Sequence, residues 1–514
     1  MRPVYITTPL YYVNAEPHLG HTYTTVVADT FARHHRRGGA DTFLLTGTDE
    51  HGDKIAQAAA AAGVTPQEHA DRISRIFRET WDACGIRYDH FIRTTDDYHV
   101  RFVQDVLTRV HASGDIYFGS YGGLYCTGCE RFYTEKELVD GLCPDHRVKP
   151  SFVDEQNYFF RMSKYQARLV EHLEANPDTI FPERYRNEVL SMLRGEALGD
   201  LCISRPKSRL AWGIELPFDS NYVTYVWFDA LINYASALRH LGEERFRTLW
   251  PQAQHFIGKD ILKPHGVFWP TMLMAAGLPL YKRLNVHGYW TRGDSKMSKS
   301  LGNVIRPLEM KQRFGMDTFR YFLLREMAFG QDAVFSEDAF ITRVNADLAN
   351  NLGNLISRTL SMQQRYFGGV VQELGTPTAE DRDLTVAFLR AIDEVRVQTE
   401  HLAFHRALEA LWQAIDHANK YIVVTAPFTL WKQEAQRPRV GEILHHLLEA
   451  LYVAAVLLAP FLPETSARLL GFLGHPPEAS LGASWSWGQA LRPGQSVAPS
   501  EILFPRIEAA LPAA

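Results

Sequence analysis

The sequence predicts an α/β fold, a doubly wound parallel sheet that is interrupted by a metal-binding insertion and followed by an all-α helix bundle. Short β-branched and aromatic runs alternate with helical stretches over the first 115 residues and return after residue 220. Between these parts, cysteine and histidine occur in two pairs with the spacing of metal ligands. From Asn345 onward, apolar residues recur at helical spacing and strand signals are few. The sheet domain is therefore predicted to be of the Rossmann type.

The length of 514 residues predicts two or three domains, because one compact core does not grow that large. Hydrophobic residues make up 46% and charged residues 22%, which is typical of a globular protein. The net charge of -5 argues against a generally basic nucleic-acid binder, so any RNA contacts must come from local patches. We predict six segments: the first half of the sheet domain (1–115), the insertion (116–220), the second half of the sheet domain (221–289), a basic-loop linker (290–345), a helical domain (346–470) and a C-terminal strap (471–514).

The first strand and the helix after it form a predicted anion site. Val4–Thr8 is β-branched and aromatic, and the strand is expected to end at Pro9. A helix is predicted to begin at His18, so that His18 and His21 project from one face of its first turn. There the free N–H groups and the helix dipole favour an anion, and Gly20 allows a ligand to approach the backbone. The alternative is a pair of capping or metal-binding histidines.

A second predicted anion site is the basic loop Gly293–Asn303, which carries Lys296 and Lys299 between glycines. Lysine serves as a point charge for phosphate. The strand-like run Arg283–His287 precedes this loop and directs it to the carboxyl end of the sheet, where ligands bind in open α/β folds. Such a loop alone is more typical of a solvated turn. Together with the histidines, it predicts a site that holds a triphosphate from two sides.

The insertion carries a C-x2-C…C-x2-H pattern, which is the spacing of a tetrahedral zinc site. The four predicted ligands are Cys126, Cys129, Cys143 and His146. Because all four positions are protein ligands, the site is predicted to be closed and structural rather than catalytic. The remaining cysteines, Cys84 and Cys202, are expected to be buried as small hydrophobic side chains.

The second half of the chain predicts a helix bundle. One apolar helical face is formed by Leu348, Leu352, Leu355 and Ile356, and another by Phe404, Leu408, Leu411, Ile415, Ala418 and Ile422. The tail after Gly471 is rich in Pro, Gly, Ser and Ala and is expected to pack as an irregular strap. The longest apolar stretch, Ala450–Leu462, is short for a membrane span, and the start of the chain leads straight into a strand. A cytoplasmic protein without a membrane anchor is expected.

The two anion sites resemble the signatures of class I aminoacyl-tRNA synthetases, His18-Leu19-Gly20-His21 and Lys296-Met297-Ser298-Lys299-Ser300. Further segments resemble the methionyl family of that class. They are Pro9 to Asn14, Thr46 to Gly52, Tyr225 to Ala230, His255 to Asp260 and Val286 to Tyr289. The resemblance is dense over the sheet domain and looser over the bundle.

The resemblance implies activation of methionine with ATP and transfer of the methionyl group to the 3′ end of its tRNA. It implies catalytic roles for His18, His21, Lys296 and Lys299, and ATP binding by His18, Gly20, His21 and Lys299. It implies methionine binding by Leu10, Tyr12, Asp49, Trp227, Tyr234 and His287, and anticodon binding by Asn354, Arg358 and Phe428. The implied cofactors are one structural Zn²⁺ and Mg²⁺ with ATP. The implied partner is tRNA(Met), including the initiator, with no DNA, no membrane and a monomeric chain.

Two departures from the family pattern and two rival functions remain. Phe428 stands where the family often has tryptophan, and Trp431 is a possible substitute. Leu231 stands where some members have proline, so the edge of the pocket is expected to differ.

The nearer rival is a class I synthetase for leucine, isoleucine, valine or cysteine, but the insertion is short for an editing domain and its zinc site is closed. The more distant rival is a non-catalytic tRNA-binding protein, which is expected to have lost a signature residue.

Overall fold

The computed structural model describes residues 3–126, 131–133, 135–144, 147–195, 197–292, 295–296, 304–482 and 484–508. The chain divides into two compact units, one of residues 1–28 and 40–287 and the other of residues 29–39 and 288–514.

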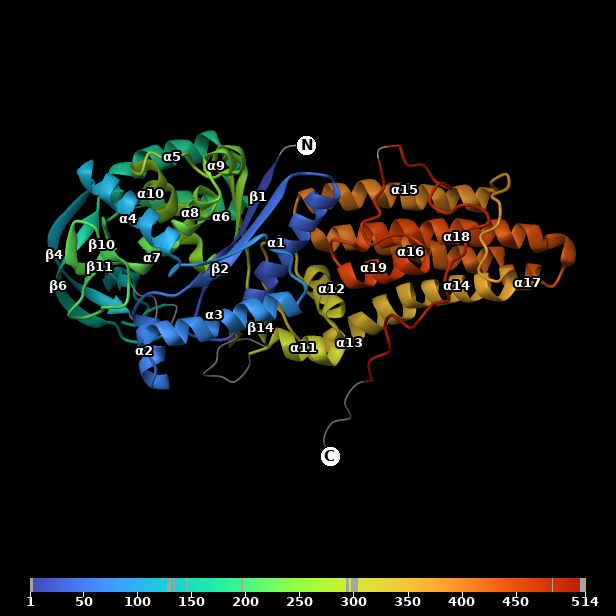
Figure 1. Ribbon diagram of the computed structural model, residues 1–514, viewed down its shortest axis with the longest axis horizontal. Coiled ribbons are helices and arrows are strands. Elements are labelled where there is room, and N and C mark those ends of the chain that lie inside the picture. The colour runs from blue at the N-terminus through green and yellow to red at the C-terminus, as the bar shows by residue number, and fades with distance from the viewer. Residues whose placement is uncertain are drawn as a thin grey trace, which may run out of the picture. The chain divides into compact units, whose positions relative to one another are not determined.

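A six-stranded parallel sheet forms the centre of the first unit (Figure 1). Its order is β3 (His90–Arg93), β2 (Thr42–Asp49), β1 (Val4–Tyr12), β12 (Ala253–Gly258), β13 (Arg283–His287) and β7 (Ile180–Phe181). Every neighbouring pair is parallel, which confirms the predicted parallel sheet. Every residue of β2 and β12 is buried, as expected where both faces of a sheet are covered.

Strand β1 does not end at Pro9 as the sequence predicted. It continues to Tyr12, and its pairing register with β2 shifts between Thr7 and Leu10. Proline has no N–H to donate to a neighbouring strand, and the irregularity absorbs this loss without ending the strand. The extension brings Leu10 and Tyr12 to the carboxyl edge of the sheet.

Helices follow the first strands in alternation. They are α1 (Leu19–Arg37), α2 (Asp53–Ala62), α3 (Pro66–Ala83) and α4 (Asp97–Ala112). Helix α3 starts with a capping box in which Thr65 and Glu68 bind each other's backbone N–H groups, and it buries Phe77 and Trp81. Later helices of this unit are α7 (Val226–Ala230), α8 (Asn233–His240), α9 (Glu243–Leu249) and α10 (Trp269–Ala275).

The insertion contains two small antiparallel sheets. The first has the order β5 (Arg131–Tyr133), β4 (Ile116–Cys126), β6 (Ser151–Phe160) and β8 (Leu201–Cys202), and the second has the order β10 (Glu215–Leu216), β11 (Asp219–Thr224) and β9 (Ser204–Pro206). Helices α5 (Gln166–Ala175) and α6 (Glu183–Gly195) lie between β6 and β8 in sequence.

The sequence predicted that strands of the parallel sheet return after residue 220, and this is wrong for the first β-branched and aromatic run there, Tyr222–Trp227. Residues up to Thr224 belong to β11, which pairs antiparallel within the insertion, and helix α7 begins at Val226. β-Branched and aromatic residues favour a strand but do not determine which sheet it joins. Conversely, β7 comes from the insertion and joins the edge of the parallel sheet beside β13.

The second unit is mainly helical, as predicted (Figure 1). It also contains a short sheet of β14 (Trp290–Arg292), β15 (Ser295–Lys296) and β16 (Ala333–Val334). The helices are α11 (Pro307–Phe314), α12 (Met316–Glu326), α13 (Glu337–Arg343), α14 (Asn354–Phe367), α15 (Ala379–Glu400), α16 (Phe404–Thr425), α17 (Pro427–Leu430), α18 (Arg437–Leu458) and α19 (Pro463–Phe472). A π-helical segment, Val344–Gly353, precedes α14.

Both predicted apolar faces of the bundle are buried, which confirms the helical periodicity. Among the described residues, one segment, Glu434–Leu458, is long and apolar enough to cross a membrane, but 89% of its most apolar stretch is buried. It is the central helix of the bundle. In the tail, residues 473–482 and 484–508 form an irregular strap on the bundle. Within the strap, Trp487 Nε1 donates to His446 Nδ1 at 2.9 Å and the Leu491 N–H donates to Glu449 at 2.8 Å.

Candidate functional site

The strand order creates a switch point between β1 and β12. The chain runs from β1 outward to β2 and β3, and β12 is then added on the opposite side of β1. Connections that leave in opposite directions open a crevice at the carboxyl ends of these two strands, where open α/β sheets bind ligands. The segment with His18 and His21 follows β1, and the segment Gly258–Asp260 follows β12.

The two signature histidines lie together at the start of α1. Their rings stack with centroids 3.7 Å apart and planes inclined by 22°. The Gly20 N–H donates to His18 Nδ1 at 3.1 Å, so Nδ1 is an acceptor and the neutral ring carries its proton on Nε2. A Cβ atom at Gly20 would lie 3.1 Å from His18 Cε1. Glycine is therefore needed here to leave room for the folded-back His18 ring.

His21 rests on aromatic residues that the sequence reasoning missed. The rings of His21 and Tyr11 have centroids 4.9 Å apart, and Tyr11 stacks on Phe77 at 5.6 Å with an interplanar angle of 7°. The Tyr11 hydroxyl also bonds to Thr25 Oγ1 at 2.7 Å and donates to the His21 carbonyl at 3.3 Å. Strand β1 and helix α3 thus hold the first turn of α1. The sequence feature that could have identified Tyr11 is its position directly before Tyr12, in the family-like segment from Pro9 to Asn14.

Tyr12, Trp227 and Tyr234, three of the predicted methionine-binding residues, join through His265 into one chain of rings. Tyr12 meets Trp227 edge-on at 6.4 Å, and Trp227 meets His265 edge-on at 6.3 Å. The Tyr234 hydroxyl lies 2.8 Å from His265 Nε2. Tyr234 and His265 are buried, whereas Tyr12 and Trp227 keep part of their surface exposed. His265 was not predicted from the sequence, although it lies five residues after the family-like segment that ends at Asp260.

The hydrogen bonds of His265 define its tautomer and its charge. Its Nδ1 donates to the Ile261 carbonyl at 3.0 Å, so Nε2 accepts the hydroxyl proton of Tyr234. Burial lowers the pKa of His265 to about 4, and burial also raises the pKa of Tyr234. Both side chains are therefore neutral at pH 7. A neutral aromatic surface of this kind suits an uncharged, polarisable side chain.

Asp49 ends β2 and is 3% exposed. In the pairing of β1 with β2, Asp49 lies opposite Tyr12, the first residue of the ring chain. The next residue, Glu50, receives two hydrogen bonds from Arg93, at 2.7 and 2.8 Å, and Trp212 Nε1 donates to the Glu50 carbonyl at 2.5 Å. The loop after β2 is therefore held firmly by its neighbours.

His287 has a different environment from the other predicted methionine-binding residues. Its Nε2 lies 2.7 Å from Thr24 Oγ1, and its ring meets Tyr23 edge-on at 4.9 Å. Both partners belong to α1. Leu10, the remaining predicted residue, is partly buried and packs against the core of the first unit.

Several predicted residues lie outside the described part of the chain. They are Cys129, His146 and Lys299, and only the backbone of Lys296 is described, in β15. Cys126 and Cys143 are 1% and 0% exposed and belong to one small buried cluster with Tyr133. Among the described residues, no group of three or more His, Cys, Asp or Glu side chains is arranged to hold a metal ion.

The predicted anticodon residues lie on the second unit. Asn354 is exposed at the start of α14, and Arg358 lies one turn further, away from the buried face. Phe428 is 49% exposed on α17. Trp431 instead stacks on Tyr366, with ring centroids 4.5 Å apart, so it packs within the bundle and leaves Phe428 as the accessible ring.

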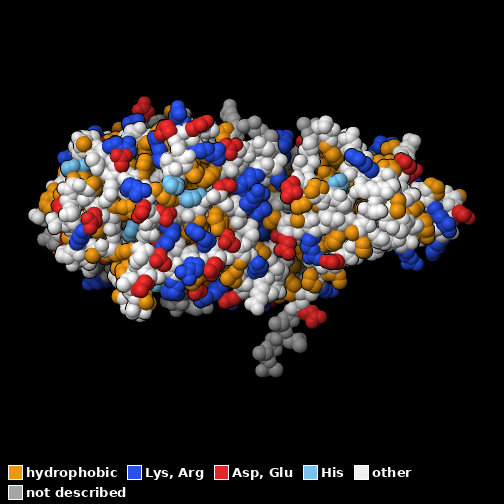
Figure 2. All heavy atoms as spheres, viewed as in Figure 1, with side chains coloured by type: hydrophobic (Ala, Val, Ile, Leu, Met, Phe, Trp, Pro, Cys, Tyr) orange, Lys and Arg blue, Asp and Glu red, His pale blue; other side chains and the backbone are white. Residues whose placement is uncertain are grey.

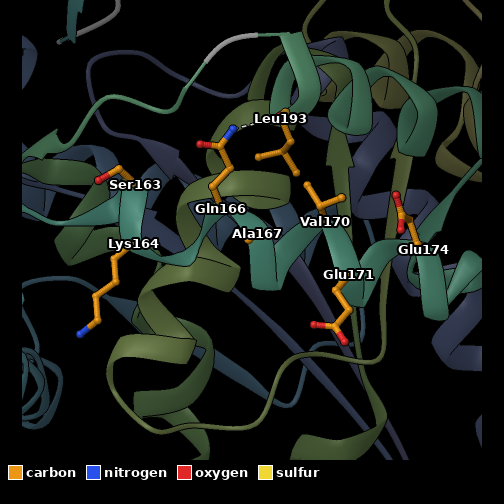
Figure 3. Close-up of a pocket in the computed structure, with 8 residues that line it drawn as sticks. All are labelled: Ser163, Lys164, Gln166, Ala167, Val170, Glu171, Glu174 and Leu193. Carbon is orange, nitrogen blue, oxygen red and sulfur yellow. Dashed lines mark hydrogen bonds between the residues drawn. The ribbon is translucent and has the colours of Figure 1, made fainter.

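One open pocket of the first unit has a volume of about 540 Å³ and is lined by the residues labelled in Figure 3. Its lining comes from the region of α5 and α6: Ser163, Lys164, Gln166, Ala167, Val170, Glu171, Glu174 and Leu193. Gln166 donates to the Leu193 carbonyl across it. None of the predicted site residues lines it. On the face seen in Figure 2, acidic and basic side chains are largely interspersed, in keeping with the net charge of -5.

Comparisons with known proteins match both units. The family model described as tRNA synthetases class I (M) matches residues 4–151 and 146–360, and the anticodon binding domain of methionyl tRNA ligase matches residues 371–511. The chain belongs to the class I methionyl-tRNA synthetases. Its activity is that of a methionine–tRNA ligase. The matched anticodon-binding domain implies that tRNA is a partner.

Individual relatives are similar over nearly the whole chain. The methionine–tRNA ligase of Caldanaerobacter subterraneus is 45% identical over 506 residues, which is 98% of this chain and 79% of that protein. The enzyme of Deinococcus radiodurans is 47% identical over 519 residues, covering 99% of this chain and 75% of that protein. The structure of Mycobacterium tuberculosis methionyl-tRNA synthetase in complex with methionyl-adenylate is 42% identical. It superimposes with a TM-score of 0.94 over 98% of this chain and 100% of that chain.

Proposed function

We propose that methionine binds against the ring chain of Tyr12, Trp227 and Tyr234, with Asp49 accepting the ammonium group. The observation that carries this proposal is the neutral Tyr234–His265 pair, which continues the partly exposed Tyr12 and Trp227 rings. A thioether is a weak acceptor and is best recognised by apolar, polarisable surfaces. Leu10 supplies backbone contacts at the end of β1. His287, whose described side-chain contacts are with α1, is also proposed to line the methionine side chain.

We propose that ATP binds at the start of α1. His18 and His21 donate to phosphate oxygens as negative charge builds up, and Gly20 keeps His18 in place. The methionine carboxylate attacks the α-phosphorus, and pyrophosphate leaves. This step needs no protein nucleophile, so catalysis rests on positioning and on charge stabilisation. Lys296 and Lys299 are proposed to hold the leaving pyrophosphate, and Mg²⁺ with ATP neutralises its phosphates.

The proposed zinc site uses Cys126, Cys129, Cys143 and His146. Support comes from the two thiols that are described, because both are buried in one cluster beside Tyr133. Thiolates are the preferred ligands of structural zinc, and a closed tetrahedral site stabilises a small fold without taking part in chemistry. We likewise propose that the segment interrupting the sheet domain is a zinc-binding insertion.

The second unit is proposed to recognise the anticodon of tRNA(Met), including the initiator, through Asn354, Arg358 and Phe428. The exposed Phe428 ring offers a stacking surface for an unpaired base. The chain is proposed to act as a monomer in the cytoplasm, without DNA or membrane partners. The six-segment division of the chain remains a prediction, with residues 1–115 and 221–289 as the catalytic halves.

The decisive experiment is ATP–pyrophosphate exchange with each amino acid in turn. Methionine alone is expected to support exchange. Exchange with leucine and not with methionine would exclude the proposed pocket. Trp227→Ala is expected to raise the KM for methionine and to leave the KM for ATP unchanged, and an unchanged KM for methionine would show that the substrate binds elsewhere.

A further inference from the structure

A continuous chain of buried hydrogen bonds runs behind the proposed methionine pocket. His51 Nδ1 lies 2.6 Å from Asp229 Oδ2, His99 Nε2 lies 2.8 Å from Asp229 Oδ1, and His99 Nδ1 lies 2.8 Å from Ser236 Oγ. The four residues are between 0% and 6% exposed. We call this set, Ser236–His99–Asp229–His51, the buried relay.

The members of the relay come from four separate segments. His51 follows β2, His99 lies on α4, Asp229 lies on α7 and Ser236 lies on α8. The hydrogen bonds span 178, 130 and 137 positions of sequence. No local interaction can hold these segments together, so their mutual placement depends on the relay and the packing around it.

Each of three proposed pocket residues lies two positions before a member of the relay. Asp49 precedes His51, Trp227 precedes Asp229, and Tyr234 precedes Ser236. The ammonium acceptor and the two aromatic walls are thus joined through one carboxylate. We propose that the buried relay, with Asp229 at its centre, positions Asp49, Trp227 and Tyr234 for methionine binding. The proposal rests on the proposed methionine site.

The electrostatics of Asp229 explain why the buried relay resists displacement of its members. Burial alone would raise the pKa of its carboxyl group, but the neighbouring His51 and His99 outweigh burial and hold the pKa below its usual value. The group is therefore a buried carboxylate at neutral pH. A buried charge is tolerated only while its partners are in place, so any displacement of the loop after β2 or of α7 is penalised.

The test measures KM for methionine, KM for ATP and kcat in pyrophosphate exchange, together with the melting temperature. Asp229→Asn replaces one accepting carboxylate oxygen with an NH2 group, which faces a histidine nitrogen and cannot accept its proton. This variant is expected to raise the KM for methionine about tenfold or more, with little change in the KM for ATP. The matched control is Asp115→Asn, because Asp115 is 3% exposed and is paired with Lys164 and Tyr165, neither of which belongs to the relay. It is expected to lower the melting temperature and to leave both KM values unchanged.

A second pair of variants decides the question if Asp229→Asn does not fold. His51→Asn keeps a donor at the place of Nδ1 and is expected to keep a nearly normal KM for methionine, whereas His51→Ala is expected to raise it. The proposal is overturned if His51→Ala leaves the KM for methionine unchanged, or if Asp115→Asn raises it as much as the relay variants do. Trp227→Ala is measured alongside. A raised KM in Trp227→Ala with normal relay variants refutes the relay alone, and a normal KM in Trp227→Ala refutes the pocket itself.

Discussion

Replacing Gly20 with alanine is expected to separate stability from catalysis. The Cβ atom of Gly20→Ala would lie 3.1 Å from His18 Cε1 and 3.3 Å from His18 Nδ1, which is tighter than ordinary contact. The His18 ring must move by a few tenths of an ångström, and the hydrogen bond from the Gly20 N–H weakens. Alanine also favours a helix over glycine by up to about 1 kcal/mol. Stability is therefore expected to stay constant or rise.

Catalysis is expected to fall in the same variant. The hydrogen bond contributes about 1 kcal/mol, and a displacement approaching 1 Å of a catalytic group costs up to about 100-fold in rate. Because about 1 kcal/mol corresponds to about fivefold in rate and the ring moves by less than about 1 Å, we expect kcat for pyrophosphate exchange to fall by about fivefold or more, and by less than about 100-fold. The matched control is Gly471→Ala in α19, because a Cβ there meets no atom within 4 Å. A normal kcat in Gly20→Ala, or an equal loss in Gly471→Ala, would refute this account of His18.

Three further predictions concern the loop lysine, the pH dependence and the anticodon surface. Lys299→Ala is expected to cost about 3 kcal/mol of transition-state stabilisation in exchange while methionine binding by calorimetry persists, and loss of binding would assign the loop to the fold. Burial lowers the pKa of His265 from 6.5 to about 4, so the unfolded chain binds more protons than the folded chain between these values. The stability that His265 contributes is complete above pH 6.5 and is lost as the pH falls toward 4. The unfolding free energy should then drop by about 3 kcal/mol more in the wild type than in His265→Gln, and equal drops would contradict the neutral ring. Phe428→Ala is expected to raise the KM for tRNA about tenfold or more with unchanged tRNA-independent exchange, whereas Trp431→Ala should chiefly lower the melting temperature, and an unaffected KM in Phe428→Ala would remove its role.

Local patterns in the sequence predicted much of the fold. The strand at Arg283–His287, the start of α1 and the buried face with Leu348 and Leu352 are all visible as composition and periodicity. The run at Tyr222–Trp227 misled because a strand's composition does not specify its partner. Pro9 was wrongly predicted to end the first strand, because the shift in register between Thr7 and Leu10 accommodates the N–H group that proline lacks.

The candidate site was only partly accessible from the sequence. Residues inside recognisable motifs, such as His18 and Trp227, could be named, but His265 could not, because its role depends on a hydrogen bond to Tyr234. His51 and Asp229 lie inside segments that resemble the family, but their pairing with each other and with His99 could not be seen in the sequence. Their significance comes from contacts between segments more than 100 positions apart, and neither spacing nor hydrophobic period records such contacts.

Strand β7 makes the insertion inseparable from the domain that it interrupts. Because Ile180 and Phe181 pair with Leu284 and Asn285, excising residues 116–220 would strip the parallel sheet of its outer strand and leave the backbone of β13 open to another chain. The insertion is therefore not a module that recombination could exchange freely between relatives. A graft from another synthetase would have to bring its own matching strand, and shortening within this segment is tolerated only on either side of β7.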